Sequence, residues 1–342
     1  MKHERKTNPE LLRIGYLGSL YHSSHVIRYN RWVEESLGLD VQWHRCDTGP
    51  EMMALFERGL LDVGYIGLPP AIIGMDRGVP IRCVAGGHVN GTVFLASQEY
   101  STVEELGSVG EVLRQFVGKK IGTPARGSIH DIILRCHLER AGLTGKVQVV
   151  NYAVPDEVPY DICRGELAAG VGTPAMFTVY YWFYNRLGHL IVPPEVPWPD
   201  NPSYGLVAHE DLLESDVLRG FLELHVKASK YLREKLDEVV ALAQAEYKVV
   251  SARILRHAFE VSPHYCAQLT REYVNSTLLF VPVMERLKYL SGRLVGTTPE
   301  QAESLIFAPD LIHEVHPPGD HYRTSCVKDV TENGTAGGVA KD

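Results

Sequence analysis

The sequence lacks the paired cysteines of small metal and redox motifs. Its six cysteines stand at positions 46, 83, 136, 163, 266 and 326, and no two of them form a CxxC pair. Neither a zinc ribbon nor a thioredoxin-type motif is therefore present. Scattered cysteines of this kind are typical of buried free thiols in a reducing compartment.

Long apolar runs are also missing. The first residues, MKHERKTNPELLRIGYLG, pass from charged residues directly into a predicted strand. They contain no apolar segment of roughly 7–15 residues, which a signal peptide would need. No later apolar run reaches the roughly 18 residues of a membrane span. We expect no membrane span. The protein is expected to be cytoplasmic as written, and periplasmic or on the extracellular face if the native start lies upstream.

The sequence has no excess of basic residues. It has 34 Lys and Arg against 42 Asp and Glu, a net charge of −8, and no basic stripe. Nucleic acid is therefore not an expected partner, because phosphate backbones require a basic face. A small anionic ligand remains compatible with this charge, since a few backbone N–H groups can hold one.

The chain does contain a regular alternation of strand and helix patterns. The segments LLRIGYL, DVQWHRC, DVGYIGL and PIRCVAGG read as strands, and amphipathic helical segments separate them. Short connections between such elements favour a parallel, doubly wound α/β sheet. The pattern restarts near residue 97, and residues 211–307 are helical throughout.

We predict a two-lobed clamshell. Lobe I comprises residues 10–96 plus 204–315, lobe II comprises 97–203, and 316–342 form a flexible tail. The chain crosses twice between lobes, and a cleft between two α/β lobes is a common place for a small ligand. Ligands in such sheets bind beyond the carboxyl ends of the strands.

The first loop at a strand end is GSLYHSSHV. It offers Gly18, Ser19, His22 and Ser23 to a ligand. N–H groups and hydroxyls at a helix start can hold an anion or a polar head group. Ser23 or Ser24 as an ordinary helix N-cap is the open alternative.

Two further loops follow in the same half of the chain. YIGLPP contributes Tyr65, Gly67, which allows close backbone approach, and Pro69 at a first helical turn. AGGHVNG contributes His88 and Asn90. Core packing for Tyr65, and a structural role at the crossover for His88 and Asn90, are equally open.

The segment GTPARGSIHDIILRCHLERAGL places Ser128, His130 and Asp131 where a strand ends and a helix begins. Ser128 can cap the helix, and Asp131 in the first turn suits the helix dipole. His130 gains nothing from that dipole. The set exceeds what capping requires, so we interpret it as part of an anion or polar-ligand site.

These segments resemble substrate-binding proteins for nitrate, taurine and alkanesulfonates. The resemblance rests on this same segment, on FERGLLDVGYIGLPPAIIGMDRGVPIRCVAGG and on ICRGELAAGVGTPAM, in family order over residues 12–215. It implies a type II periplasmic-binding-protein fold without a cofactor. The pocket would be lined by Ser19, Ser23, Gly67, Ser128, His130, Thr173 and Pro174. The chain departs from the pattern at Ile129, which replaces a serine, and at Ala168, which replaces an acidic residue.

Three functions remain open. The first is capture of a small anionic or polar organic solute, with the permease and ATPase of an ABC importer as partners. The second is a biosynthetic enzyme or sensor on the same fold. The superfamily includes enzymes of thiamine-pyrimidine and menaquinone-precursor synthesis, and the Cys-rich motif of the former is absent here. The third, metal binding, would use some of His22, His25, His44, His88, His130 and His137.

The aromatic run FTVYYWFYNRLGHL leaves two interpretations. Its rings pack against the lobe core as part of an amphipathic helix, or they line one wall of the cleft. A wall of rings would favour an organic ligand over nitrate.

Overall fold

Two five-stranded sheets form the framework of the protein. The computed structural model describes residues 10–18, 22–183, 188–248 and 250–317. The first sheet has the order β2-β1-β3-β10-β4 and the second β7-β6-β8-β5-β9. We keep the names lobe I and lobe II for these sheets with the helices that cover them. The first sheet contains β1 (Leu11–Leu17), β2 (Asp40–Cys46), β3 (Val63–Ile66), β4 (Ile81–Val89) and β10 (Pro202–His209). The second contains β5 (Val93–Ser97), β6 (Lys120–Pro124), β7 (Gln148–Tyr152), β8 (Ala169–Gly172) and β9 (Gly188–Val192).

Both sheets are mixed rather than wholly parallel. In lobe I, β10 runs antiparallel to β3 and β4. In lobe II, β5 runs antiparallel to β8 and β9. Both antiparallel strands follow a crossover between the lobes. β5 brings the chain from lobe I into lobe II, and β10 brings it back to lobe I. The predicted fold class, a two-lobed type II periplasmic-binding-protein arrangement, is confirmed.

The helices of the first 200 residues connect these strands. They are α1 (Ser23–Tyr29), α2 (Trp32–Leu37), α3 (Gly49–Glu57), α4 (Leu68–Asp76), α5 (Val103–Leu106), α6 (Val109–Arg114), α7 (Ile129–Arg140), α8 (Glu157–Cys163) and α9 (Pro174–Phe183). The segment HSSHVIRYNRWVEESLG, residues 22–38, has apolar residues at the spacing of one continuous helix, but the structure divides it into α1 and α2. Arg31 has a φ of 51°, and the Asn30 side-chain amide donates to the Val26 carbonyl, which competes with the helical hydrogen bond.

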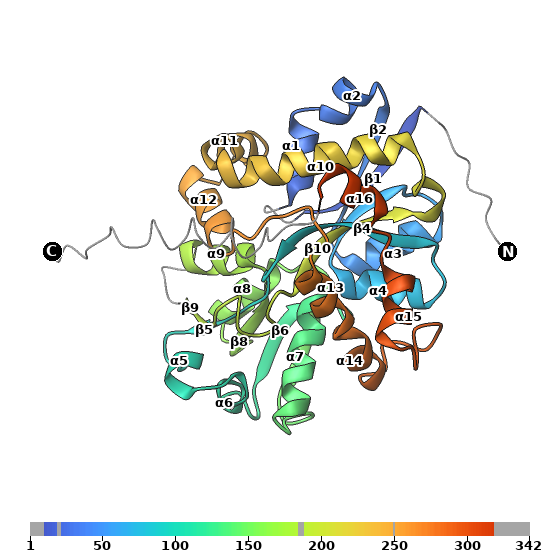
Figure 1. The fold of residues 1–342 in the computed structure, drawn as a ribbon. Coiled ribbons are helices and arrows are strands. Elements are labelled where there is room, and N and C mark those ends of the chain that lie inside the picture. The colour runs from blue at the N-terminus through green and yellow to red at the C-terminus, as the bar shows by residue number, and fades with distance from the viewer. Residues whose placement is uncertain (1–9, 19–21, 184–187, 249, 318–342) are drawn as a thin grey trace.

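The C-terminal third is helical, as its sequence predicts. It contains the 3₁₀ turn η1 (Glu210–Leu212), α10 (Asp216–Glu234), α11 (Leu236–Glu246), α12 (Ala252–Glu260), α13 (Arg271–Leu278), α14 (Phe280–Arg286), α15 (Pro299–Ile306) and α16 (Asp310–Val315). In Figure 1, α10 lies across the top of lobe I, and α14 and α15 lie low in the view, to the right of α7. No helix in the described ranges is both long and apolar enough to cross a membrane.

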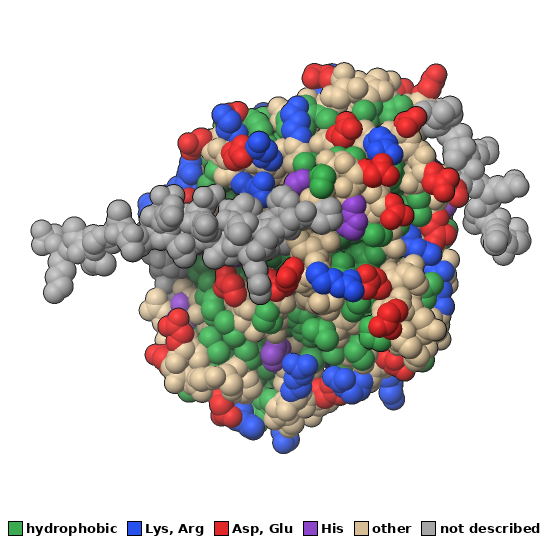
Figure 2. Space-filling model, in the orientation of Figure 1, with side chains coloured by type: hydrophobic (Ala, Val, Ile, Leu, Met, Phe, Trp, Pro, Cys, Tyr) green, Lys and Arg blue, Asp and Glu red, His purple; other side chains and the backbone are tan. Residues whose placement is uncertain are grey.

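One apolar core runs through both lobes. Its members include Ile14 and Val63 of lobe I and Ile121 and Ile132 of lobe II. A smaller cluster around Tyr180 fills the rest of lobe II. On the face seen in Figure 2, acidic and basic side chains are intermixed. The crossovers join Val89 to Val93 and Val192 to Pro202. The finer boundaries of the lobes stay a prediction, and most of the predicted tail lies outside the described residues.

Candidate functional site

Among the helices that follow the carboxyl ends of parallel strands, four have predicted site residues at their starts. They are α1 after β1, α4 after β3, α7 after β6 and α9 after β8. The start of α4 meets the start of α7, because a Cβ built on Gly67 would lie 3.8 Å from Cγ2 of Ile129. The carboxyl edges of the two sheets therefore face each other across the lobe boundary. Helix starts present N–H groups and positive dipole ends, which suit an anionic or polar ligand.

In lobe I, Ser23 belongs to a buried hydrogen-bond network. Its backbone N–H donates to the Tyr204 hydroxyl at 3.0 Å, and that hydroxyl donates to Ser23 Oγ at 3.3 Å. Ser23 Oγ also lies 3.3 Å from Nδ1 of His225, and the Tyr65 hydroxyl lies 3.4 Å from the same nitrogen. The network joins Ser23 and Tyr65 through a histidine on α10.

The surroundings of His225 fix its protonation. Its Nε2 lies 2.8 Å from the carbonyl oxygen of Gly86, which can only accept, so Nε2 carries the proton. Nδ1 then accepts from the hydroxyls of Ser23 and Tyr65. Burial lowers the pKa of His225 to about 4. The imidazole is therefore neutral near pH 7 and serves as a hub for hydroxyl groups.

The β1–α1 loop supplies further predicted residues. His22 is buried, and its ring centroid lies 4.1 Å from that of Tyr204. Burial, followed by the neighbouring His25 and His88, lowers the pKa of His22 well below its ordinary value. Gly18 lies against Arg45, whose Nε would be 2.9 Å from an added Cβ. Ser19 lies outside the described residues.

Pro69 and Tyr65 are both buried on the β3–α4 segment. Pro69 stands in the first turn of α4, where a proline costs no helical hydrogen bond. Tyr65 packs edge-on against Tyr204 and Phe221. Tyr65 is thus held in the lobe I core, with its hydroxyl turned to His225.

His88 and Asn90 lie where the chain leaves lobe I. The His88 Nε2 donates to the Ser262 carbonyl oxygen at 2.6 Å, and burial lowers the His88 pKa to about 3. Asn90 has a φ of 57°, and its N–H donates to the Asn201 carbonyl in the returning crossover. Ser262 Oγ donates to the Asn90 carbonyl at 2.7 Å. These contacts tie the two crossovers to each other and to the segment after α12.

In lobe II, Ser128 caps α7 and Asp131 anchors it. Ser128 Oγ accepts from the Asp131 N–H at 3.3 Å. The Asp131 carboxylate is fully buried and accepts from Arg135 and Asn151 through Oδ1. Through Oδ2 it accepts from the Gly127 N–H and the Tyr289 hydroxyl. Four protein donors surround this carboxylate, so it fixes the position of the helix start.

His130 points in another direction from Asp131. Its Nδ1 lies 3.0 Å from Thr92 Oγ1, at the entry of the chain into lobe II. Burial lowers the His130 pKa to about 3, so the ring is neutral at physiological pH. A neutral ring can donate a hydrogen bond through one nitrogen and accept through the other.

Thr173 and Pro174 form the start of α9. Thr173 Oγ1 accepts from the Met176 N–H at 3.1 Å, and Pro174 is the first residue of the helix. Among the described aromatic rings of this helix, Tyr180 and Phe177 belong to the smaller lobe II core. Phe177 also packs beside His257 of α12, with the ring centroids 5.8 Å apart. The described rings therefore support core packing.

Sequence reasoning missed Tyr204, His225, Thr92 and Tyr289. A signal existed for His225, which follows Leu218, Phe221 and Leu222 on the buried face of α10. A histidine at an apolar helical position either completes its hydrogen bonds within the core or belongs to a functional site. No local signal singles out Tyr204 or Tyr289, because their partners stand far away in the sequence.

The part of the chain that the structure describes contains neither a disulfide nor a cluster of metal-ligating side chains. Cys46, Cys83, Cys136, Cys163 and Cys266 are free, and burial raises the pKa of Cys46 to about 12. Within the described ranges, no group of three His, Cys, Asp or Glu side chains is placed to hold a metal ion.

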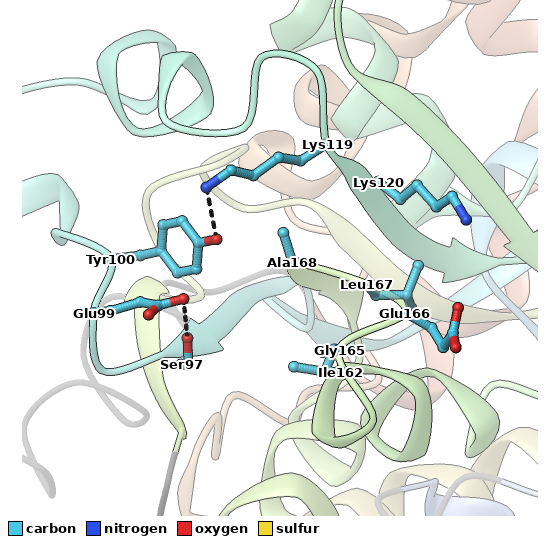
Figure 3. A pocket seen from close by; sticks show the side chains of 10 residues that line it. All are labelled: Ser97, Glu99, Tyr100, Lys119, Lys120, Ile162, Gly165, Glu166, Leu167 and Ala168. Carbon is cyan, nitrogen blue, oxygen red and sulfur yellow. Dashed lines mark hydrogen bonds between the residues drawn. The ribbon is translucent and has the colours of Figure 1, made fainter.

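A pocket of about 450 Å³ in lobe II lies away from this site (Figure 3). It is lined by Lys120, at the amino end of β6, and by Ser97, at the same edge of the sheet. The candidate residues lie at the carboxyl end of β6. Two lysines and two glutamates line the pocket, and Lys119 Nζ donates to the Tyr100 hydroxyl at 2.9 Å.

Solved structures with a similar fold bind small solutes. The alkanesulfonate-binding protein SsuA from Xanthomonas axonopodis pv. citri, bound to MOPS, matches at a TM-score of 0.67 and 14% identity, over 84% of this chain and 96% of that one. The periplasmic nitrate-binding protein NrtA from Synechocystis PCC 6803 matches at 0.71 and 13%, over 92% and 91%. The ligand-binding component of an ABC-type import system from Staphylococcus aureus, with zinc bound, matches at 0.72 and 15%, over 90% and 100%. At these identities the likeness establishes the fold.

Sequence comparison gives the family. No curated protein matches the chain in sequence. The profile of the NMT1-like family, however, matches residues 5–245, which include both sheets and the starts of α1, α4, α7 and α9. With a match over more than half of its length, the chain belongs to the NMT1-like family.

Proposed function

We propose that the protein captures a small anionic or polar organic solute between its lobes and delivers it to an ABC importer. The observation that carries this proposal is the meeting of α4 and α7 at Gly67 and Ile129, which brings two helix starts from different lobes together. The fold shared with sulfonate-binding and nitrate-binding proteins supports the same function.

Buried hydroxyls support a polar ligand. Ser24 Oγ at the start of α1 and Thr123 Oγ1 near the end of β6 are buried, and neither has a hydrogen-bond partner among the described residues. A buried polar atom without a partner costs about 1–3 kcal/mol. A polar solute at the carboxyl edges of the two sheets would offset that cost.

The chemistry of the site favours recognition by dipoles rather than by buried cations. His130, His88 and His225 are neutral because burial lowers each pKa to about 3 or 4. Neutral imidazoles, hydroxyls and helix N–H groups hold a sulfonate or a polar head group through hydrogen bonds. The aromatic rings of Tyr65 and Tyr204 behind α1 are engaged in the core.

The enzyme alternative has a candidate pair in Ser23 and His225. Their residue types match a nucleophile and a base, but both side chains are 0% exposed. Nδ1 of His225 is also shared with the Tyr65 hydroxyl. We therefore assign this pair to holding α1 against α10.

Calorimetry with a panel of solutes tests the proposal. The purified chain is titrated with taurine, alkanesulfonates, nitrate and small heterocyclic precursors, after native mass spectrometry has identified any molecule that co-purifies. We expect one solute class to bind, and His130→Ala to weaken it at least about tenfold, or about 1.4 kcal/mol. His313→Ala, on α16, is the matched control and should leave the affinity unchanged.

Two results would count against the proposal. One is equal affinity of the two histidine variants for the bound solute, which would place the site elsewhere. The other is a co-purifying pyridoxal phosphate, flavin or metal, which would favour the enzyme or metal alternatives.

A further inference from the structure

A second pocket lies at the junction of the lobes, between α3, α4 and the loop before α7. Its volume is about 350 Å³. Pro50, Met53, Pro70 and Ile73 supply an apolar wall from lobe I. Gly127 closes the pocket from lobe II, and a Cβ built there would lie 3.1 Å from Ile73 Cδ1. A pocket of this volume suits one small organic molecule.

Basic side chains dominate the rim of this pocket. Arg77, Arg126 and Lys288 line it with a single carboxylate, Glu57, which lies 3.9 Å from Arg77. Among the described residues, Arg126 and Lys288 form no ion pair, and Arg126 lies over the Tyr289 ring at 5.4 Å. The pocket therefore has two positive charges in excess. Cationic side chains that line one cavity raise the local concentration of anions.

Lys288 occupies a backbone position that favours glycine. Its φ is 61°, directly after the C-cap of α14. The Tyr289 N–H donates to the Met284 carbonyl, and the Lys288 N–H donates to the Glu285 carbonyl, as at a helix end where glycine is usual. A side chain in this region costs roughly 1 kcal/mol. A strained residue that carries a charge to a pocket points to a function for that charge.

We propose that this pocket binds a small organic dianion of the phosphate monoester class and that the ligand bridges the lobes. The apolar wall takes the organic part, and Arg126 and Lys288 hold the phosphate. Arg126 belongs to the β6–α7 loop of lobe II, whereas Lys288 follows α14. None of the solute-binding residues predicted from the sequence lines this pocket, although Gly127 and Tyr289, which donate to Asp131, do. The inference does not rest on the proposed function.

The pocket of Figure 3 provides a matched control. It also holds two lysines, Lys119 and Lys120, but Glu99 and Glu166 balance their charge. The double variants Arg126→Gln/Lys288→Gln and Lys119→Gln/Lys120→Gln remove the same two charges from the whole chain. A difference in ligand affinity between the two double variants therefore reflects the loss of charge at this pocket and not the change in net charge.

The test is calorimetry with phenyl phosphate on the full chain. We expect millimolar or tighter binding to the unmodified protein, weakened at least about tenfold by the first double variant and less than about twofold by the control. Affinity should fall as salt is added. Equal affinity of the two double variants, or no binding to the unmodified protein, would overturn the proposal.

Two single variants test whether the ligand contacts both lobes, and their melting temperatures show whether each variant is folded. Arg126→Gln and Lys288→Gly lie on different lobes, and each should weaken phenyl phosphate binding. Lys288→Gly should also raise the melting temperature, because glycine relieves the left-handed backbone. A raised melting temperature with unchanged affinity would show that Lys288 does not contact the ligand. The solute panel, run on the same variants, should give unchanged affinities.

Discussion

At the scale of single residues, the protein keeps neutral histidines in its interior. His88, His130 and His225 are all buried, and each ring has a defined hydrogen-bond partner. An imidazole inside a protein can order hydroxyl groups without introducing a charge that must be paired. The same arrangement makes the folded state less stable when the solution becomes acidic.

Stability should fall as the pH decreases. Burial lowers the pKa of His88 and His130 to about 3 and that of His225 to about 4. In the unfolded chain a histidine titrates near about 6.5. Below that value the unfolded state takes up protons that the folded state does not. The stabilisation is therefore complete above about pH 6.5. It is lost as the pH falls toward about 4 for His225 and toward about 3 for His88 and His130, by up to about 1.4 kcal/mol per unit for each histidine.

Urea unfolding at pH 7.5, 6.0 and 5.0 measures this loss. His225→Gln should reduce the dependence on pH, since the amide can still donate to the Gly86 carbonyl but does not titrate. A free energy of unfolding that stays constant between pH 7.5 and 5.0 would contradict the expectation.

At the scale of elements, strand positions follow from the sequence and the partners of strands do not. The apolar run LLRIGYL and the alternating segment DVQWHRC predict β1 and β2 with their observed ends. The break between α1 and α2 depends on the left-handed Arg31, which an amphipathic pattern does not reveal. The antiparallel placement of β10 depends on the whole chain path, which local patterns leave open.

The candidate site was predictable in its loops but not in its network. Ser128 as a helix cap follows from its position before an amphipathic segment, and the structure gives it that role. Ser23, in contrast, meets Tyr204 and His225 at sequence separations of 181 and 202 residues. Contacts at such separations arise from packing of the complete lobe. The ligand contacts of the predicted residues stay a prediction.

The loop after Tyr289 is held by Asp76 of α4. The N–H groups of Ser291 and Gly292 donate to Asp76 Oδ2, and that of Leu294 donates to Oδ1. A Cβ built on Gly292 would lie 2.2 Å from the Asp76 carbonyl oxygen. Backbone approaches backbone here, so only glycine fits.

Gly292→Ala should therefore destabilise the protein by about 2–4 kcal/mol, because the loop must move and its hydrogen bonds to Asp76 must lengthen. Chemical denaturation gives the value. Gly110→Ala is the matched control, since the nearest atom to its Cβ, in Ala141, lies 3.5 Å away and alanine favours the helix. Equal stability of the two variants would mean that the loop adapts without cost.

At the scale of the whole molecule, a few polar contacts cross between lobes. The Tyr289 hydroxyl donates to Asp131 at the start of α7. Arg286 of α14 donates to Glu139 of the same helix at 2.8 Å. A third contact joins α9 to α12, where Thr178 Oγ1 lies 3.0 Å from Nδ1 of His257. Such contacts bias the lobes toward their present arrangement and can be removed singly.

Tyr289→Phe should loosen the lobes. It removes a hydrogen bond to a buried carboxylate, a contact of about 1.5–3 kcal/mol. We expect a larger radius of gyration in small-angle X-ray scattering and faster amide exchange at the start of α7. Tyr152→Phe removes a comparable bond, to Asp161 inside lobe II, and should change neither observable. An unchanged radius together with unchanged exchange would show that this contact does not hold the lobes.

The position of β10 has a consequence for biosynthesis. This strand lies between β3 and β4, yet the ribosome produces it after every strand of the second sheet. The strands of lobe II, β5 to β9, are continuous in the sequence. Their sheet can therefore form completely while β3 still lacks its partner β10. Exposed edges of this kind invite wrong pairing. During synthesis the nascent chain must protect that gap until residue 209 has left the exit tunnel, so slow translation of residues 93–201 would lengthen the period of greatest risk.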